Sequence, residues 1–124
     1  GLVDKAGACA IVHSDSSRDI QRLNQEAAKA MSAMLRMGQA VAPERAITWI
    51  TSNPAKALGI EEKTGSLEIG KAADLVLWNS NPFSVYSHAE LVLIDGYLYY
   101  DRNDPNLQPV TDFSLGQTSR TVGP

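Results

Sequence analysis

Two residues have types and a spacing that could do chemistry, His13 and Asp15. They lie two positions apart at the end of the apolar run over residues 8–13, so on a strand both side chains would point to the same side. A carboxylate at a strand end can ligate a metal or accept a proton from a metal-activated water. Plainer roles also fit this pattern: Asp15 could cap a helix beside Ser16, and His13 could hydrogen-bond within the protein.

The residues around this pair predict a strand, a short loop and a helix. Residues 8–13 are mostly small or β-branched and lack polar alternation, as in a strand covered on both faces of a parallel α/β sheet. Ser16 followed by Asp19 resembles a capping box, and Gly38 suits a left-handed helix end. This order places Asp15 at the carboxyl edge of the sheet, where binding and chemistry gather. The predicted helix has one apolar face at three- and four-residue steps: Ile20, Leu23, Ala27, Ala30, Met31, Met34 and Met37.

Further helix is predicted beyond Gly38. Pro43 suits a first helical position, where its missing N–H is not needed. We expect an interruption at Asn53-Pro54, because a proline disfavours helical geometry at the residue before it, and a short resumption over 55–58. Asn24, in the first helix, is expected on the polar, solvated side.

After residue 59 the pattern changes from helical to strand-like. Asp95-Gly96 between two apolar runs is a strong hairpin signal, because this dipeptide suits the tight turns that join antiparallel strands. Strands are predicted over residues 66–69, 73–78, 91–94 and 97–100.

Composition narrows the class of protein. The chain has 124 residues, a net charge of -3 and 44% hydrophobic residues, which suits one compact domain. Because the balance is slightly acidic, nucleic acid is an unexpected partner. No apolar run is long enough to span a bilayer, so no membrane partner is expected. The single cysteine, Cys9, can form no internal disulfide.

The order of these elements and motifs resembles the carboxy-terminal region of the amidohydrolase superfamily, especially imidazolonepropionase-like and related cyclic-amide or dipeptide hydrolases. The resembling stretch runs from about residue 11 to residue 100. The motifs that carry the resemblance are Thr51-Ser52-Asn53-Pro54-Ala55 with Leu58-Gly59, Gly65-Ser66-Leu67, Gly70-Lys71, Ala73-Asp74-Leu75-Val76 and Asn81-Pro82.

The resemblance implies an α/β fold in which a (β/α)8 barrel carries a metal centre and a small β-sandwich is built from both chain ends. Residues 1–58 would be the terminal strand-helix part of the barrel, with 8–13 as its last strand, 59–104 a β-sandwich portion and 105–124 an extended tail. Asp15 aligns with the aspartate that ligates the metal and acts as general base. The implied cofactor is a divalent metal, expected to be zinc, with one or two ions in the complete enzyme.

Other parts of the family's metal site have no counterpart in this sequence. The His-x-His pair, the bridging lysine and the two later histidines are absent, and neither His13 nor His88 matches one of those positions. One aspartate cannot hold a catalytic zinc, which needs about three protein ligands. With Gly1 at its start, the chain is therefore expected to be an incomplete fold that is inactive alone.

The implied function is hydrolysis of a C–N bond in an amide, cyclic amide or dipeptide, on a small-molecule substrate bound by the complete enzyme. The missing amino-terminal barrel portion or a homo-oligomer is the expected partner. The alternative is a non-catalytic interaction module derived from the same scaffold. A cytoplasmic location is expected, with a periplasmic or secreted one left open.

Overall fold

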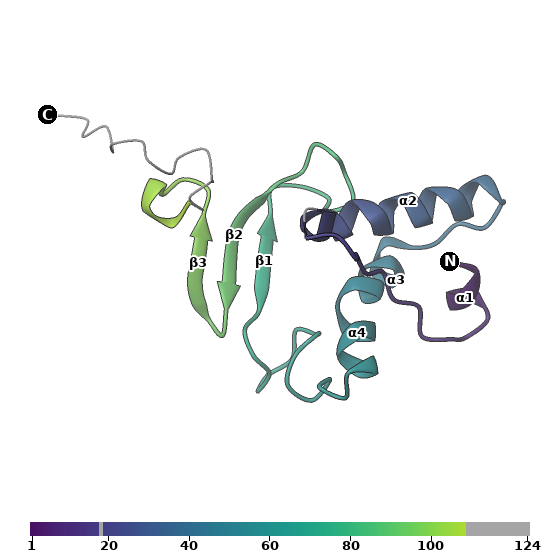
Figure 1. Ribbon diagram of the computed structural model, residues 1–124, viewed down its shortest axis with the longest axis horizontal. Helices are drawn as coiled ribbons and strands as arrows, with labels where there is room; N and C mark the ends of the chain where they lie inside the picture. Colours follow the sequence, from purple (N-terminus) through teal and green to yellow (C-terminus); the bar gives the residue numbers. More distant parts are fainter. Residues whose placement is uncertain (18, 109–124) are drawn as a thin grey trace, which may run out of the picture.

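Helices make up the first half of the chain and a small sheet the second half in the computed structural model, which describes residues 1–17 and 19–108 (Figure 1). The longest helix is α2, and short helices and 3-10 turns surround it. In chain order the helical elements are α1 (Leu2–Lys5), η1 (Asp19–Arg22), α2 (Leu23–Arg36), α3 (Pro43–Ala46), η2 (Ile47–Ile50) and α4 (Ser52–Ala57).

The predicted first helix is confirmed, with a different beginning. The Ser16 hydroxyl accepts a hydrogen bond from the Asp19 N–H at 3.3 Å, as the capping pattern predicts, but the first turn is the 3-10 turn η1. At the other end Gly38 has φ +73°, the predicted left-handed stop. Ala27 and Met34 of the apolar face are buried, whereas Ile20, near the helix start, is exposed. The buried face of the helix therefore covers fewer residues than the apolar face that the sequence predicts.

The second helical stretch begins at Pro43 as predicted, but its interruption lies elsewhere. The backbone breaks at Thr51, with φ -130° and ψ -92°, and α4 begins at Ser52, before the proline. Pro54 thus occupies the first turn of α4, where a backbone N–H has no intrahelical partner to lose. The expected break at Asn53 was wrong for this reason.

The predicted strand over residues 8–13 does not form in the described chain. A strand needs a neighbour to complete its ladder, and none of the described strands lies beside this segment. Its backbone is instead held by the helices, with the Val12 N–H donating to the Trp49 carbonyl at 3.0 Å. The side chains of Ala10 and Val12 pack against the helical core.

The second half forms a three-stranded antiparallel sheet in the order β1 (Leu75–Trp78), β2 (Ala89–Ile94) and β3 (Tyr97–Asp101). The predicted hairpin between β2 and β3 is confirmed. Asp95 has φ +51° and Gly96 has φ +79°, the pair of positive values that a tight hairpin turn requires.

The predicted strand over residues 66–69 is wrong. This segment is a turn in which the side chain of Glu68 accepts from Ser66 at 2.5 Å and from Lys71 at 3.0 Å. Leu67 and Ile69, which suggested the alternation, are both exposed. Local polar contacts thus replace sheet pairing where the described chain offers no adjacent strand.

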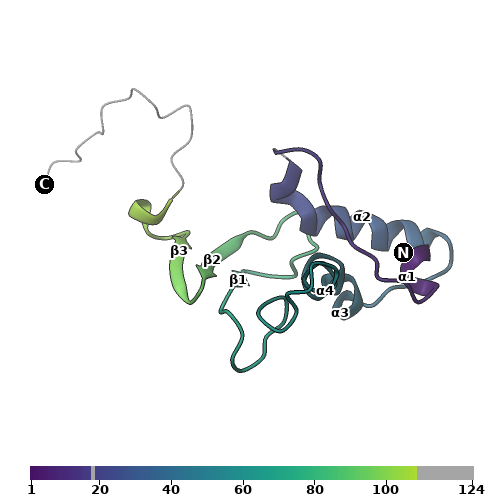
Figure 2. The same ribbon diagram turned by 60° about the horizontal axis from the view of Figure 1, so that its bottom comes forward.

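A small core joins the helices to the loop between β1 and β2. Ala27, Ala46 and Trp49 are fully buried, and Phe83 from that loop packs against them. Asn24, expected in solvent, is only 8% exposed because its side-chain amide donates to the Pro82 carbonyl at 2.6 Å. The sheet itself lies beside the helices rather than beneath them (Figure 2).

Beyond β3 the chain makes one 3-10 turn, η3 (Pro105–Leu107). Most of the tail predicted over 105–124 lies outside the described residues, which end at 108. No helix within the described ranges is long and apolar enough to cross a membrane.

Candidate active-site segment

Asp15 and His13 lie together at the end of the segment that crosses the helices. The Asp15 Oδ1 and the His13 Nδ1 are 3.4 Å apart, and the two side chains are 96% and 75% exposed. The predicted proximity of the pair is therefore observed. At the helix start that follows, the Ser16 hydroxyl accepts from the Asp19 N–H.

Exposure alternates residue by residue from Cys9 to Asp15. Ala10, Val12 and Ser14 are partly buried, and the four residues between and beside them are exposed. This is the two-residue period of an extended chain with one side covered. Asp15 thus belongs to the side that faces away from the helices, together with Cys9, Ile11 and His13.

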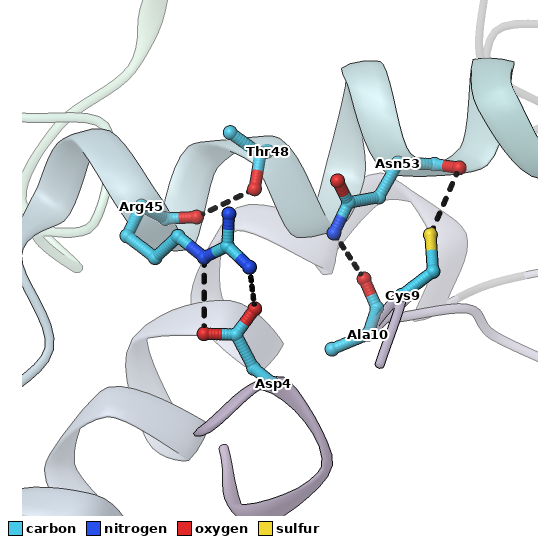
Figure 3. Close-up of polar contacts among 6 residues, drawn as sticks. All are labelled: Asp4, Cys9, Ala10, Arg45, Thr48 and Asn53. Atoms are coloured by element: carbon cyan, nitrogen blue, oxygen red, sulfur yellow. Dashed lines mark hydrogen bonds and ion pairs between the residues drawn. The ribbon is translucent and has the colours of Figure 1, made fainter. Parts of the chain in front are cut away.

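Asn53 of α4 makes two contacts with the segment that leads to Asp15 (Figure 3). The Asn53 side-chain amide donates to the Ala10 carbonyl at 2.7 Å, and the Cys9 thiol lies 3.7 Å from the Asn53 carbonyl as donor. Nearby, Arg45 binds Asp4 through two contacts, Nη2 to Oδ1 at 2.6 Å and Nε to Oδ2 at 3.1 Å. The Arg45 guanidinium lowers the pKa of Asp4 and ties α1 to α3.

The donors present test whether this segment can hold a metal. No cluster of three or more His, Cys, Asp or Glu side chains occurs in the part of the chain that the structure describes. Asp15 and His13 offer one carboxylate and one imidazole, fewer than the three protein ligands of a catalytic zinc site. The described residues therefore do not make a metal site by themselves, and Asp15 can at most contribute to one completed by other residues.

Other polar clusters have structural partners. Asp74 accepts from the Asp95 N–H at 3.0 Å and from the Thr64 hydroxyl at 2.9 Å. Both bonds lower the pKa of Asp74, and the bond from the Asp95 backbone has the larger effect. His88 pairs with Glu90 at 3.0 Å on the sheet side of the molecule. A hollow of about 340 Å³ beside α1 is lined by Asp4, Arg45 and neighbours, and Asp15 is not among them.

Comparison with known proteins decides the family. The model of the amidohydrolase family matches residues 2–112, most of the chain. The chain belongs to the amidohydrolase family. The resemblance seen in its motifs is therefore confirmed.

Curated relatives of this amidohydrolase chain include imidazolonepropionases. That of Shewanella oneidensis is 55% identical over 49 residues, which are 37% of this chain and 12% of the relative. That of Shewanella baltica is 53% identical over the same length. The chain thus matches only about an eighth of the length of these curated relatives.

Solved structures give a longer match. The crystal structure of an amidohydrolase from Thermotoga maritima is 35% identical, with a TM-score of 0.64 over 81% of this chain and 25% of that one. A second amidohydrolase crystal structure, 23% identical, has a TM-score of 0.60 over 83% of this chain and 25% of that one. The described fold is therefore found within larger amidohydrolases.

Sequence reasoning missed the two asparagines that matter most to the packing, Asn24 and Asn53. The sequence predicts Asn24 on the solvated side, and it presents Asn53 as the residue before a proline and as part of the family motif over residues 51–55. Both donate through the side-chain amide to backbone carbonyls more than forty residues away. Pairing of such distant residues leaves no local pattern, so no signal in the sequence alone could have identified these partners.

Proposed function

We propose that this chain is the carboxy-terminal part of a metal-dependent amidohydrolase that hydrolyses a C–N bond through a metal-activated water, and that it is inactive alone. The observation that carries the proposal is the position of Asp15. The carboxylate ends a segment whose other side packs on helices, so it faces away from them. A barrel strand has this same division, with one side toward the helices and the other toward the interior.

The fold proposed for the complete enzyme follows from that division. Residues 8–13 would be the last strand of the (β/α)8 barrel, paired with strands outside this chain, within a barrel part spanning 1–58. Residues 59–104 would contribute the carboxy-terminal strands of the small β-sandwich, and 105–124 an extended tail. The TM-scores of 0.64 and 0.60 against larger amidohydrolases support this placement.

The role proposed for Asp15 is that of metal ligand and general base. Asp15, together with ligands outside this chain, would hold a divalent cation, which we propose to be zinc, and the bound cation would supply a water with a pKa lowered toward neutrality. The Asp15 carboxylate would accept a proton from the attacking water as the C–O bond forms, and would release it to the leaving nitrogen as the C–N bond breaks. The His13 Nδ1 lies 3.4 Å from the Asp15 Oδ1, so a protonated imidazole would form an ion pair with the carboxylate.

The proposed substrate is a small molecule with an amide, cyclic amide or dipeptide bond. Likeness to imidazolonepropionases over 49 residues supports a place in this group. The proposed partner is the remaining amino-terminal portion of the amidohydrolase fold, because the solved relatives are about four times longer than the region they share with this chain.

The test is Asp15→Asn in the complete enzyme, with Asp19→Asn as the matched control on a nearby carboxylate. We expect kcat to fall by about 10²–10⁴-fold in the first variant, because the base is lost, with bound metal reduced and the far-UV circular dichroism unchanged. Asp19→Asn should keep kcat within about twofold. Retained turnover in Asp15→Asn would show that Asp15 is neither base nor essential ligand.

A further inference from the structure

We propose that Asn53 is a positioning residue for Asp15, acting through the backbone of residues 9–12. This inference rests on the proposed function, since it assigns to Asn53 the task of holding the segment that carries the carboxylate. Asn53 lies 38 positions from Asp15 in the sequence, and its side chain donates to the Ala10 carbonyl rather than to the carboxylate.

The contacts of Asn53 are made to two consecutive residues. Its side-chain Nδ2 donates to the Ala10 carbonyl at 2.7 Å in a partly buried position. Its own backbone carbonyl faces the Cys9 thiol, with 3.7 Å between Sγ and O. Figure 3 shows both contacts on the side of α4 that faces the segment. Asn53 thus contacts two adjacent residues of the segment, one through its side chain and one through its backbone carbonyl.

These contacts fix which side of the segment faces the helices. Together with the bond from the Val12 N–H to the Trp49 carbonyl, they hold the backbone at two points two residues apart. With Ala10 and Val12 held inward, the two-residue period directs His13 and Asp15 outward. If the segment slipped by one residue against the helices, every side chain would turn to the opposite side. Without the bond from Asn53, only the bond at Val12 would oppose that slip.

Asn53 is itself held firmly enough to act as an anchor. It precedes Pro54, whose ring fixes its own φ, within the first turn of α4. Ala55, two positions on, is only 4% exposed, and a Cβ placed at Gly65 would lie 2.5 Å from the Ala55 Cβ. The helix that carries Asn53 is therefore packed closely against the following loop.

The experiment uses Asn53→Asp and Asn53→Ala in the complete enzyme. Asn53→Asp keeps the side-chain size, and a negative charge suits the first turn of a helix, but it removes the donor to the Ala10 carbonyl. Thr48→Val is the matched control. The Thr48 hydroxyl donates to the Arg45 carbonyl at 2.7 Å, a similar side-chain-to-backbone bond in the same helical stretch that does not reach residues 9–12.

We expect kcat to fall about 10- to 100-fold in Asn53→Asp, with KM changed less than threefold, because a displacement of about 1 Å at a reacting group has effects of this size. Hydrogen exchange at the Val12 amide should become at least tenfold faster. Thr48→Val should leave both quantities within twofold. If the Asn53→Ala variant folds, it should show the same fall in kcat. If that variant does not fold, the result for Asn53→Asp alone tests the inference.

Unchanged kcat in folded Asn53→Asp would overturn the inference, even with a lower melting temperature, since a purely structural residue affects stability alone. An unchanged exchange rate at Val12 would overturn it as well. These results are separable from failure of the proposed function. If Asp15→Asn remains active the proposed function fails, whereas loss in Asp15→Asn with full kcat in Asn53→Asp removes only the role of Asn53.

Discussion

The helical region and the sheet of this chain differ in how they are held together. Every residue that is buried among those described lies between Asn24 and Ala55, and the largest fully buried side chain is Trp49. The strands within residues 75–101, by contrast, pair in two antiparallel ladders, each with one register shift, and no described side chain there is buried. The first region therefore has a buried side-chain core, whereas the second is ordered by strand pairing without one.

This difference indicates what each region lacks. A three-stranded sheet needs a covered apolar face for independent stability, because backbone hydrogen bonds largely replace equal bonds to water. Leu77 is 56% exposed and Tyr97 74% exposed. In the helical region one side of residues 9–15 is likewise exposed. Both surfaces are those that the rest of an amidohydrolase would cover under the proposed fold.

The largest effect is expected at the centre of the buried region. Trp49→Ala removes a side chain that is 1% exposed and should lower the free energy of unfolding by about 3–5 kcal/mol. The measurement is urea denaturation of the complete protein beside its parent. A loss of less than 1 kcal/mol would show that Trp49 is not the centre of a packed core, and the contrast with the sheet would not hold.

A somewhat smaller effect is expected where the loop after α4 meets that helix. Gly65→Ala combines φ +92° with a Cβ 2.5 Å from the Ala55 Cβ, so it should cost about 2–4 kcal/mol. Gly70→Ala is the control, since φ is +93° but nothing lies within 4 Å of its Cβ, and it should cost about 1 kcal/mol. Thermal unfolding of both variants gives the difference, and equal losses would mean that the close approach at Gly65 contributes nothing.

The smallest effect is expected in the sheet, and it should depend on the partner. Leu77→Ala should change the stability of the 124-residue chain by about 0.5 kcal/mol or less, because this side chain is already more than half exposed. In the complete protein the same change should cost about 2 kcal/mol, the low end for a covered leucine. Melting temperatures in the two contexts test this, and equal small shifts would indicate that no partner covers the sheet.

The sequence predicts those features that neighbouring residues decide. Asp95-Gly96 predicts the hairpin because only residues that tolerate positive φ fit its turn, and both do adopt positive values. Periodicity predicts α2, and Ser16 predicts the bond to the Asp19 N–H, which lies at the start of η1. The local pattern places Asp15 at the end of a predicted strand, and the family resemblance adds the role of metal ligand and general base, which we propose for it.

Distant partners explain what could not be predicted. Residues 8–13 look like a strand, but a strand forms only where another lies beside it, and the described chain provides none there. The amides of Asn24 and Asn53 look like exposed or turn-forming groups until the fold brings Pro82 and Ala10 to them. The break was predicted at Asn53 but lies at Thr51, because a proline is tolerated in the first turn of a helix.

A crystal structure of the complete enzyme, with anomalous diffraction recorded at the absorption edge of its bound metal, tests the central claim most directly. The account predicts an anomalous peak about 2.0–2.2 Å from an Asp15 carboxylate oxygen, with residues 8–13 paired into the barrel and Ala10 still bound by Asn53. A metal centre formed without Asp15, with that side chain turned instead toward the helix start, would contradict it.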